Sequence, residues 1–137
     1  MTLTLSQSLA GLPAFLLYFF LSLALLVLFL VAYLAVTPYR ELKLIRDGNV
    51  AAAISLAGAV IGFVLPLGRA VTQSVSALDL VAWGLVALIV QIVVFFIVGK
   101  LMPRFPEAIR DGHVSEASFL AALAVAVGVL NAASMTI

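Results

Sequence analysis

Four long runs of apolar residues leave this chain little choice of fold beyond a bundle of helices that cross a membrane. The runs cover residues 12–36, 50–67 and 80–99, and the last extends from residue 114 to the C-terminus. A run of about 20 apolar residues is long enough to cross the hydrocarbon core of a bilayer, roughly 30 Å, as a helix. We therefore predict an all-α membrane protein with four transmembrane helices, in which residues 1–137 form a single integral membrane domain.

The composition agrees with lipid as the solvent and removes several classes of function. Hydrophobic residues make up 66% of the sequence and charged residues 9%, and the mean hydropathy is +1.33. Such a chain is too apolar for the surface of a small soluble domain. A net charge of +1 gives no reason to expect nucleic acid as a partner. The chain contains no cysteine, which excludes disulfides, thiolate metal sites and cysteine nucleophiles.

A short charged sequence occurs twice. Ile45-Arg46-Asp47-Gly48-Asn49-Val50 returns 64 residues later as Ile109-Arg110-Asp111-Gly112-His113-Val114. Each copy lies between two apolar runs, so the repeating unit is predicted to be helix, short turn, helix. Repeat 1 covers about residues 12–68 and repeat 2 about residues 79–137. Because each unit has two spans, the halves are predicted to be parallel, related by an axis along the membrane normal.

The positions of lysine and arginine predict the orientation in the membrane. The two repeated turns contain most of these residues, whereas the loop between the second and third spans contains only Arg69. Short cytoplasmic loops are enriched in lysine and arginine. Both repeated turns are therefore expected to face the cytoplasm, with both termini outside the cytoplasm.

Small residues predict where helices pack. Gly58 and Gly62 form a GxxxG pattern in the second span, and Ala122 and Ala126 occupy the equivalent positions in the fourth. Small residues allow helix backbones to approach closely, and this packing drives helix association in lipid. We expect spans two and four to form an inner layer, with the bulkier spans one and three outside. The pattern leaves open whether these faces pack within one subunit or between subunits of a homo-oligomer.

The residues that follow the two turn glycines are candidate helix caps. Asn49 and His113 each precede an apolar run, and an asparagine at such a position can accept a hydrogen bond from an otherwise free backbone N–H group. A second interpretation of His113 is a sensor of cytoplasmic pH, because an unperturbed histidine titrates near neutrality.

Few polar side chains lie in or beside the spans, and each has a structural and a functional interpretation. Gln91 is near the middle of the third span and Asn131 is toward the end of the fourth. We favour interhelical hydrogen bonds for both, with contacts to a pore or substrate as the alternative. Arg69 and Asp79 flank the outer loop, where they would form an ion pair or mark the ends of the spans.

The duplicated charges are the most distinctive polar feature. Arg46, Asp47, Arg110 and Asp111 either serve orientation and capping or form a docking surface for a cytoplasmic protein or for anionic lipid head groups. The sequence contains no recognisable catalytic constellation, metal-ligand cluster or Gly-rich phosphate loop. No enzymatic activity, cofactor or metal is therefore expected.

The chain resembles domain-of-unknown-function family 350, the YjfL-like bacterial inner-membrane proteins. The resemblance covers nearly the whole chain and rests on Gly48-Asn49-Val50-Ala51-Ala52-Ala53-Ile54 with Gly58, and on Gly112, Val114 and Ala117 in the second half. The family pattern has Gly-Asn in both halves, whereas His113 replaces the second asparagine here. The resemblance implies four spans, a bacterial plasma membrane, no established activity and companionship with envelope-stress or membrane-remodelling systems.

Two functions remain open from the sequence. The first is a non-enzymatic oligomeric membrane protein, a scaffold or accessory subunit, that docks a partner at the duplicated turns. The second is a small oligomeric channel or transporter with Gln91, Asn131 and Arg69 along its path. Four spans with so few polar groups cannot enclose a hydrated pore alone, so the second function requires several subunits.

Overall fold

The structure is a computed structural model that describes residues 2–135, and the regular structure in this part of the chain is entirely helical. Four segments are long and apolar enough to cross a membrane, so the predicted all-α membrane fold with four spans is confirmed. The long helices are α2 (Leu12–Val36), α4 (Val50–Gln73), α5 (Ala77–Leu101) and α7 (Val114–Ser134). The short helices are α1 (Thr2–Ala10), α3 (Glu41–Arg46) and α6 (Phe105–Arg110).

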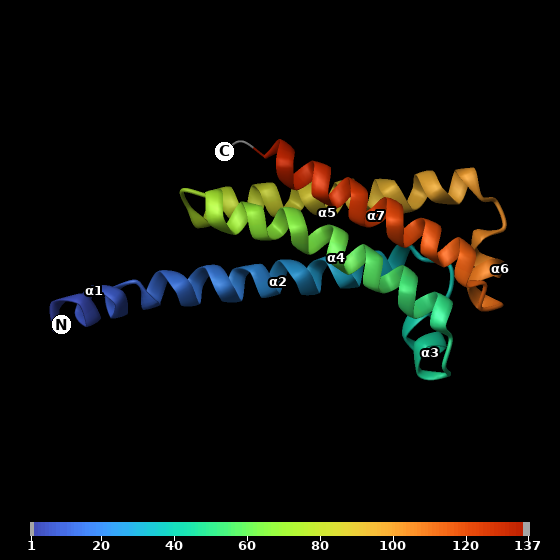
Figure 1. The fold of residues 1–137 in the computed structure, drawn as a ribbon, viewed down its shortest axis with the longest axis horizontal. Helices are drawn as coiled ribbons and strands as arrows, with labels where there is room; N and C mark the ends of the chain where they lie inside the picture. The colour runs from blue at the N-terminus through green and yellow to red at the C-terminus, as the bar shows by residue number, and fades with distance from the viewer. Residues whose placement is uncertain (1, 136–137) are drawn as a thin grey trace.

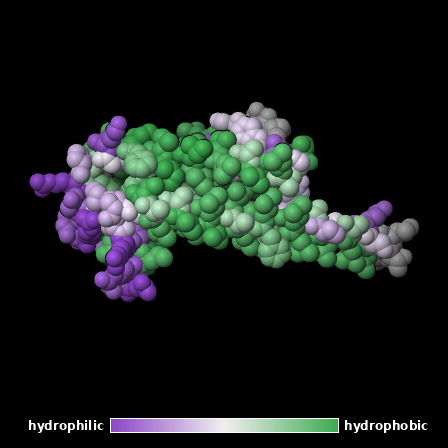
Figure 2. All heavy atoms as spheres, turned by 180° about the vertical axis from the view of Figure 1, so that it is seen from behind, coloured by the Kyte–Doolittle hydropathy of each residue, from purple (hydrophilic) through white to green (hydrophobic). Residues whose placement is uncertain are grey.

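The four long helices lie side by side, and the short helices α3 and α6 lie together at one end (Figure 1). Both ends of the described chain lie at the opposite end (Figure 1). Hydrophilic residues gather over α3 and α6, whereas apolar side chains cover the length of the bundle (Figure 2). We call the end formed by α3, α6 and the turns that follow them the polar end. Both copies of the repeated sequence therefore lie at the same end of the molecule.

The closest helix contact joins α4 to α7 within one chain. A Cβ atom added to Gly58 would lie 2.5 Å from the Cβ of Ala121, and one added to Gly128 would lie 2.7 Å from the Cα of Gly62. Such distances leave no room for a side chain, because the obstacle is the neighbouring backbone. The contact depends on Gly58 and Gly62 of α4 facing a small-residue surface of α7.

The prediction that Ala122 and Ala126 take part in this helix contact is wrong within one chain. Ala122 and Ala126 are exposed, and α7 instead faces its neighbours with Ala117, Ala124 and Gly128. The equivalent positions of the two repeats do not pack alike, because the face of α7 that contacts α4 does not include the residues that match Gly58 and Gly62. Ala122 and Ala126 are left on the outer surface of the bundle.

The predicted layering is correct for two spans and wrong for the other two. Within the most apolar part of each span, the buried share is 50% in α4 and 11% in the first span, compared with 33% in α5 and 22% in α7. The second span is thus central and the first is peripheral, as expected. The third span is more enclosed than the fourth, because α5 contacts α2, α4 and α7.

Aromatic side chains attach the peripheral helix α2 to the bundle. Phe29 of α2 stacks on Phe63 of α4, with ring centroids 4.5 Å apart and planes 4° from parallel. Tyr33 of α2 meets Phe95 of α5 edge-on at 5.5 Å, and Phe95 meets Phe105 of α6 at 6.2 Å. This aromatic row ends at the polar end, so it links the spans to the segment between α5 and α7.

The N-terminal segment, which the sequence analysis left without a predicted helix, is helical. Helix α1 precedes α2, and together they project beyond the other spans at the end opposite α3 and α6 (Figure 1). The apolar helical segment Thr4–Val36 has 33 residues, more than the 17–25 or so that a bilayer requires. The projecting part exposes large apolar side chains, including Phe15 and Phe20.

Candidate functional site

The two repeated turns have the same backbone conformation. Gly48 and Gly112 have φ angles of 90° and 78°, which place both in the left-handed region that glycine adopts without a steric penalty. In the first turn, the N–H of Asn49 donates to the carbonyl of Leu44 at 2.8 Å, and in the second the N–H of His113 donates to that of Ala108 at 2.9 Å. Each turn is a helix C-cap of the Schellman type, and it leads directly into the next span.

Asn49 joins the two turns and caps α4 with the same side chain. Its Oδ1 accepts a hydrogen bond from the N–H of Ala52 at 3.0 Å. Its Nδ2 donates to the carbonyl of Ile109 at 2.8 Å and to that of Arg110 at 3.3 Å. These carbonyls belong to the last turn of α6, where a helix has no intrahelical donors left.

A second hydrogen bond connects the second turn to the segment that precedes α3. Nη2 of Arg110, in the second copy, donates to the carbonyl of Pro38 at 2.7 Å, just before α3. Together with Asn49, this bond makes the two turns one continuous surface. A groove of about 470 Å³ lies between them, lined by residues that include Asn49, Arg110 and Asp111.

Three of the four duplicated charges, Asp47, Arg110 and Asp111, line this groove, and Arg46 lies outside its lining. Arg46, Asp47, Arg110 and Asp111 are all exposed at the polar end. None of these four side chains forms an ion pair within residues 2–135. The charges of both signs are therefore available to a partner across a single surface, which we call the joined-turn surface.

His113 does not cap α7, although Asn49 caps α4 at the equivalent position. The imidazole makes no hydrogen bond to the first turn of α7, and its Nδ1 lies 3.7 Å from Oε2 of Glu116 instead. The prediction that the His113 side chain caps this helix is therefore wrong. The ring is drawn toward a carboxylate in the first turn rather than toward the backbone.

Gln91 lies at a helix contact rather than along a path. Its side chain is 2% exposed, and its Nε2 donates to the carbonyl of Ala124 in α7 at 3.0 Å. The same nitrogen borders the space beside Gly62, where an added Cβ would approach it to 2.7 Å. The glutamine thus fills the space that the two small-residue helices leave.

The other three polar candidates do not converge with Gln91. Asn131 is partly buried, and its Nδ2 has no partner within residues 2–135. Nε of Arg69 donates to the carbonyl of Met135 at 3.4 Å, whereas Oδ2 of Asp79 accepts from the N–H of Val75 at 3.3 Å. No Arg69–Asp79 ion pair forms in the described part of the chain.

The sequence analysis missed a buried acid at the polar end. Glu41 occupies the first turn of α3 and is 1% exposed. Neither of its carboxyl oxygens has a hydrogen-bond partner among residues 2–135, and the same is true of the hydroxyls of Tyr33 and Tyr39. The only signal in the sequence was the acidic residue itself. Helix α3 has six residues, too few for the helical repeat to show which side chains face inward.

Burial changes the ionisation of this acid. Desolvation raises the pKa of Glu41 to about 7, and the nearby Tyr39 hydroxyl acts in the opposite direction. Burial and the adjacent Glu41 raise the pKa of Tyr39 well above its ordinary value. The groups are close enough to influence one another, although none is oriented as a direct hydrogen bond.

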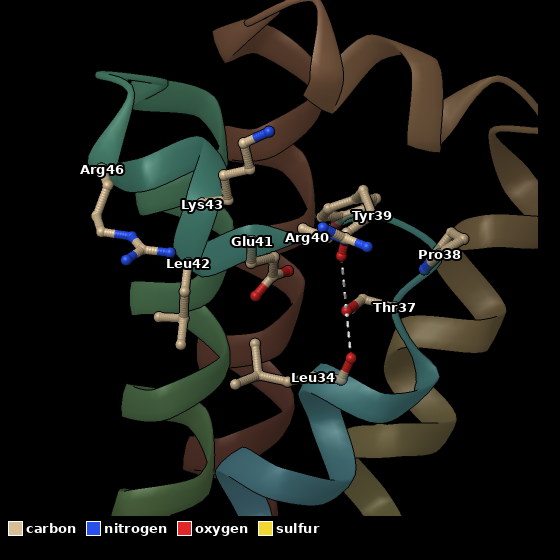
Figure 3. A pocket seen from close by; sticks show the side chains of 9 residues that line it. All are labelled: Leu34, Thr37, Pro38, Tyr39, Arg40, Glu41, Leu42, Lys43 and Arg46. Atoms are coloured by element: carbon tan, nitrogen blue, oxygen red, sulfur yellow. Dashed lines mark hydrogen bonds between the residues drawn. The ribbon is translucent and has the colours of Figure 1, made fainter.

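A shallow cavity of about 430 Å³ lies beside Glu41, between the end of α2 and α3 (Figure 3). Its lining includes Leu34, Thr37 and Arg40. Lys43 extends away from the Glu41 carboxyl group (Figure 3), and no ion pair joins Arg46 to Glu41 within residues 2–135. The cavity brings solvent close to the acid without supplying it with a cationic partner.

Four apolar helices with their charged turns at one end define a multi-pass helical membrane protein. Its sequence matches, over residues 7–135, the family described as Domain of Unknown Function (DUF350). The chain belongs to this family, and the predicted resemblance is confirmed. No solved structure matches the chain.

Similar proteins occur in two kinds of bacteria. The chain is 39% identical over 126 residues to the UPF0719 inner membrane protein YjfL of Escherichia coli (strain K12), covering 92% of this chain and 96% of that protein. It is 31% identical over 88 residues to the UPF0719 transmembrane protein YshE of Bacillus subtilis (strain 168), covering 64% and 66%. These names support an integral membrane protein whose exposed apolar surface contacts bilayer lipid.

Proposed function

We propose that this chain is a non-enzymatic, oligomeric inner-membrane protein that docks a protein partner on the joined-turn surface. The observation that carries the proposal is a pair of hydrogen bonds, from Asn49 to the last turn of α6 and from Arg110 to the segment before α3, that hold the two halves of the polar end together. A fixed surface reduces the ordering that binding requires. The role fits a scaffold or accessory subunit of an envelope or membrane-remodelling system.

The arrangement of charge favours a protein over a lipid surface as the partner. Asp47, Arg110 and Asp111 line one groove, and Arg46 is exposed at the same end of the molecule, next to Asp47 in the chain. Anionic head groups attract clusters of lysine and arginine, and the two aspartates oppose that attraction. A partner with complementary charges of both signs gains contacts from all four side chains.

The proposed oligomer uses a different surface from the helix contact within the chain. Helix α7 covers Gly58 and Gly62, whereas Ala122 and Ala126 remain exposed on the outer face of α7. A stripe of small residues allows a second helix to approach closely. We assign the subunit contact to this outer face of α7.

The alternative function as a channel gains no support from the polar residues proposed to line its path. Gln91 is enclosed between α5 and α7, and Arg69 and Asp79 make separate contacts at the far end of the bundle. These side chains do not share a surface within one chain.

The proposed orientation places the polar end in the cytoplasm and both termini outside it. Because the chain has no cysteine, single cysteines at Asp111 and at Val75, which is 88% exposed in the opposite loop, report each side without background. In intact spheroplasts, we expect a membrane-impermeant maleimide to label V75C and to spare D111C, and the pattern to reverse in inverted vesicles. Labelling of both positions from the same side would contradict the orientation.

The docking proposal is tested by photocrosslinking in native membranes. A photoreactive residue in place of Asp111 should give a discrete protein adduct, whereas the same residue in place of Asp79, at the other end, should not give that adduct. N49D should reduce the adduct at least fivefold, because aspartate keeps the cap on α4 but replaces the Nδ2 donor with an acceptor facing the carbonyl of Ile109.

The controls separate docking from folding. S115A alters an exposed side chain at the start of α7, next to the second turn, without touching either bridging hydrogen bond, so it should retain the adduct. Adducts with lipid alone, or a protein adduct that is equally strong in N49D, would contradict docking on a surface that needs both turns.

A further inference from the structure

Glu41 is an acid without the partners that a buried charge requires. Both carboxyl oxygens are inaccessible and unpaired, and no ion pair involving Glu41 occurs in residues 2–135. A buried carboxylate is strongly disfavoured unless hydrogen bonds and an opposite charge replace its lost hydration. The geometry therefore favours the form of the side chain that carries a proton.

The groups that act on Glu41 or on its neighbour Tyr39 come from each of the surrounding elements. Tyr33 of α2 and Tyr39 of the connecting segment place phenol groups close enough to interact electrostatically with the acid. Ser55 of α4 uses its hydroxyl to donate to the carbonyl of Ala52 at 3.0 Å. From α6, Arg110 acts on Tyr39 but donates its hydrogen bond to Pro38.

The cations on the acid's own segment do not neutralise it. Lys43 extends away from the carboxyl group (Figure 3), Arg40 and Arg46 are exposed residues on the lining of the cavity, and none of the three forms an ion pair with Glu41 among the described residues. A proton supplies what these residues do not, because a neutral carboxyl group carries no charge and gains an O–H donor. The hydroxyls of Tyr33 and Tyr39 have no hydrogen-bond partner within residues 2–135.

We propose that Glu41 is a proton-binding site and that loss of its proton releases α3 from the bundle. Helix α3 has six residues and ends at the Gly48 turn, so few contacts hold it. The adjoining cavity gives water a short route to the acid once it ionises. Because α3 precedes Asn49, its release would loosen the joined-turn surface, and this consequence rests on the proposed function.

The direction of the pH dependence follows from burial. The pKa of Glu41 is raised to about 7 in the folded protein, compared with about 4.3 for a free glutamate. The stabilisation from the buried neutral acid is complete below the free value and is lost as pH rises through the folded value. Helix α3 should therefore be held in acid and released above about pH 7.

The proton site is tested first in the native sequence, in lipid nanodiscs. The chain has only three glutamates, Glu41, Glu107 and Glu116, so ¹³C-labelled glutamate gives three carboxyl signals. We expect one signal to titrate near pH 7 and to remain in both E107Q and E116Q, which identifies it as Glu41 without altering that residue. Three signals that all titrate below about pH 5, near the free value, would overturn the proposal.

The release of α3 is tested with a thiol at a buried position. The maleimide labelling rate of S55C, at a residue that is 0% exposed, is divided by that of V75C, at a residue that is 88% exposed. The ratio corrects for the general rise of thiol reactivity with pH. The ratio should rise at least tenfold between pH 5 and pH 8. E41Q should hold the ratio at its acid value, whereas E107Q, which alters an exposed acid in α6, should leave the rise intact.

The two experiments give separable outcomes. A flat labelling ratio, or the same rise in E41Q, would overturn the release of α3 even if the carboxyl signal titrates near pH 7. Photocrosslinking from Asp111 at a fixed acid pH tests docking independently of Glu41. Loss of the crosslink with an intact titration would contradict the proposed function and leave the proton site in place.

Discussion

Replacing Gly62 with alanine is expected to destabilise the protein by about 3 kcal/mol, at the upper end of the cost of overpacking a core. The new methyl group would lie 2.7 Å from Nε2 of Gln91 and 2.8 Å from the carbonyl carbon of Ala124. The second obstacle is backbone, which can move away only if α7 separates from α4. Reversible unfolding in mixed micelles measures the loss.

Gly68 provides the matched control for this substitution. It lies in the same helix, but no atom lies within 4 Å of a Cβ added to it. G68A should be neutral or slightly stabilising, because alanine favours a helix by about 1 kcal/mol over glycine. A122L, on the exposed face of α7, should likewise leave the fold of a single chain intact. Equal destabilisation by G62A and G68A would contradict the described contact.

Removing the ring of Phe63 is expected to cost about 3 kcal/mol, near the lower end for phenylalanine-to-alanine changes in cores. Phe63 is 0% exposed, and it stacks on Phe29 at 4.5 Å. Membrane interiors offer little hydrophobic gain on burial, so most of the cost comes from the cavity. At about 24 cal/mol per Å³, a void the size of a ring costs on the order of 2 kcal/mol.

The effect should be specific to the attachment of α2. In F63A, proteolysis or crosslinking should show α2 separating from α4 before the α4–α7 contact opens. F20A provides the control, because Phe20 of α2 is 61% exposed and its ring meets only Phe19 among the described aromatic pairs. Comparable losses in F63A and F20A would show that lipid contact, rather than the aromatic row, holds α2.

Local signals in the sequence determined the spans and the turns. The length of each apolar run is enough to require a helix in lipid, because backbone groups there have no other partners. Gly48 and Gly112 are the residues with positive φ that end α3 and α6, and glycine at the end of a helical segment is a signal that neighbouring residues alone provide. The Asn49 cap depends on a residue only three positions away.

Only the tertiary structure decided which faces of the spans meet. In lipid, an apolar side chain is equally suited to the bilayer and to a neighbouring helix, so the pattern of apolar residues does not distinguish the two. The repeat therefore did not reveal that Ala122 and Ala126, which match the glycines of α4 by position, lie on the outside of the bundle. The partners of Asn49 in the second turn and the burial of Glu41 likewise depend on contacts between segments distant in the chain.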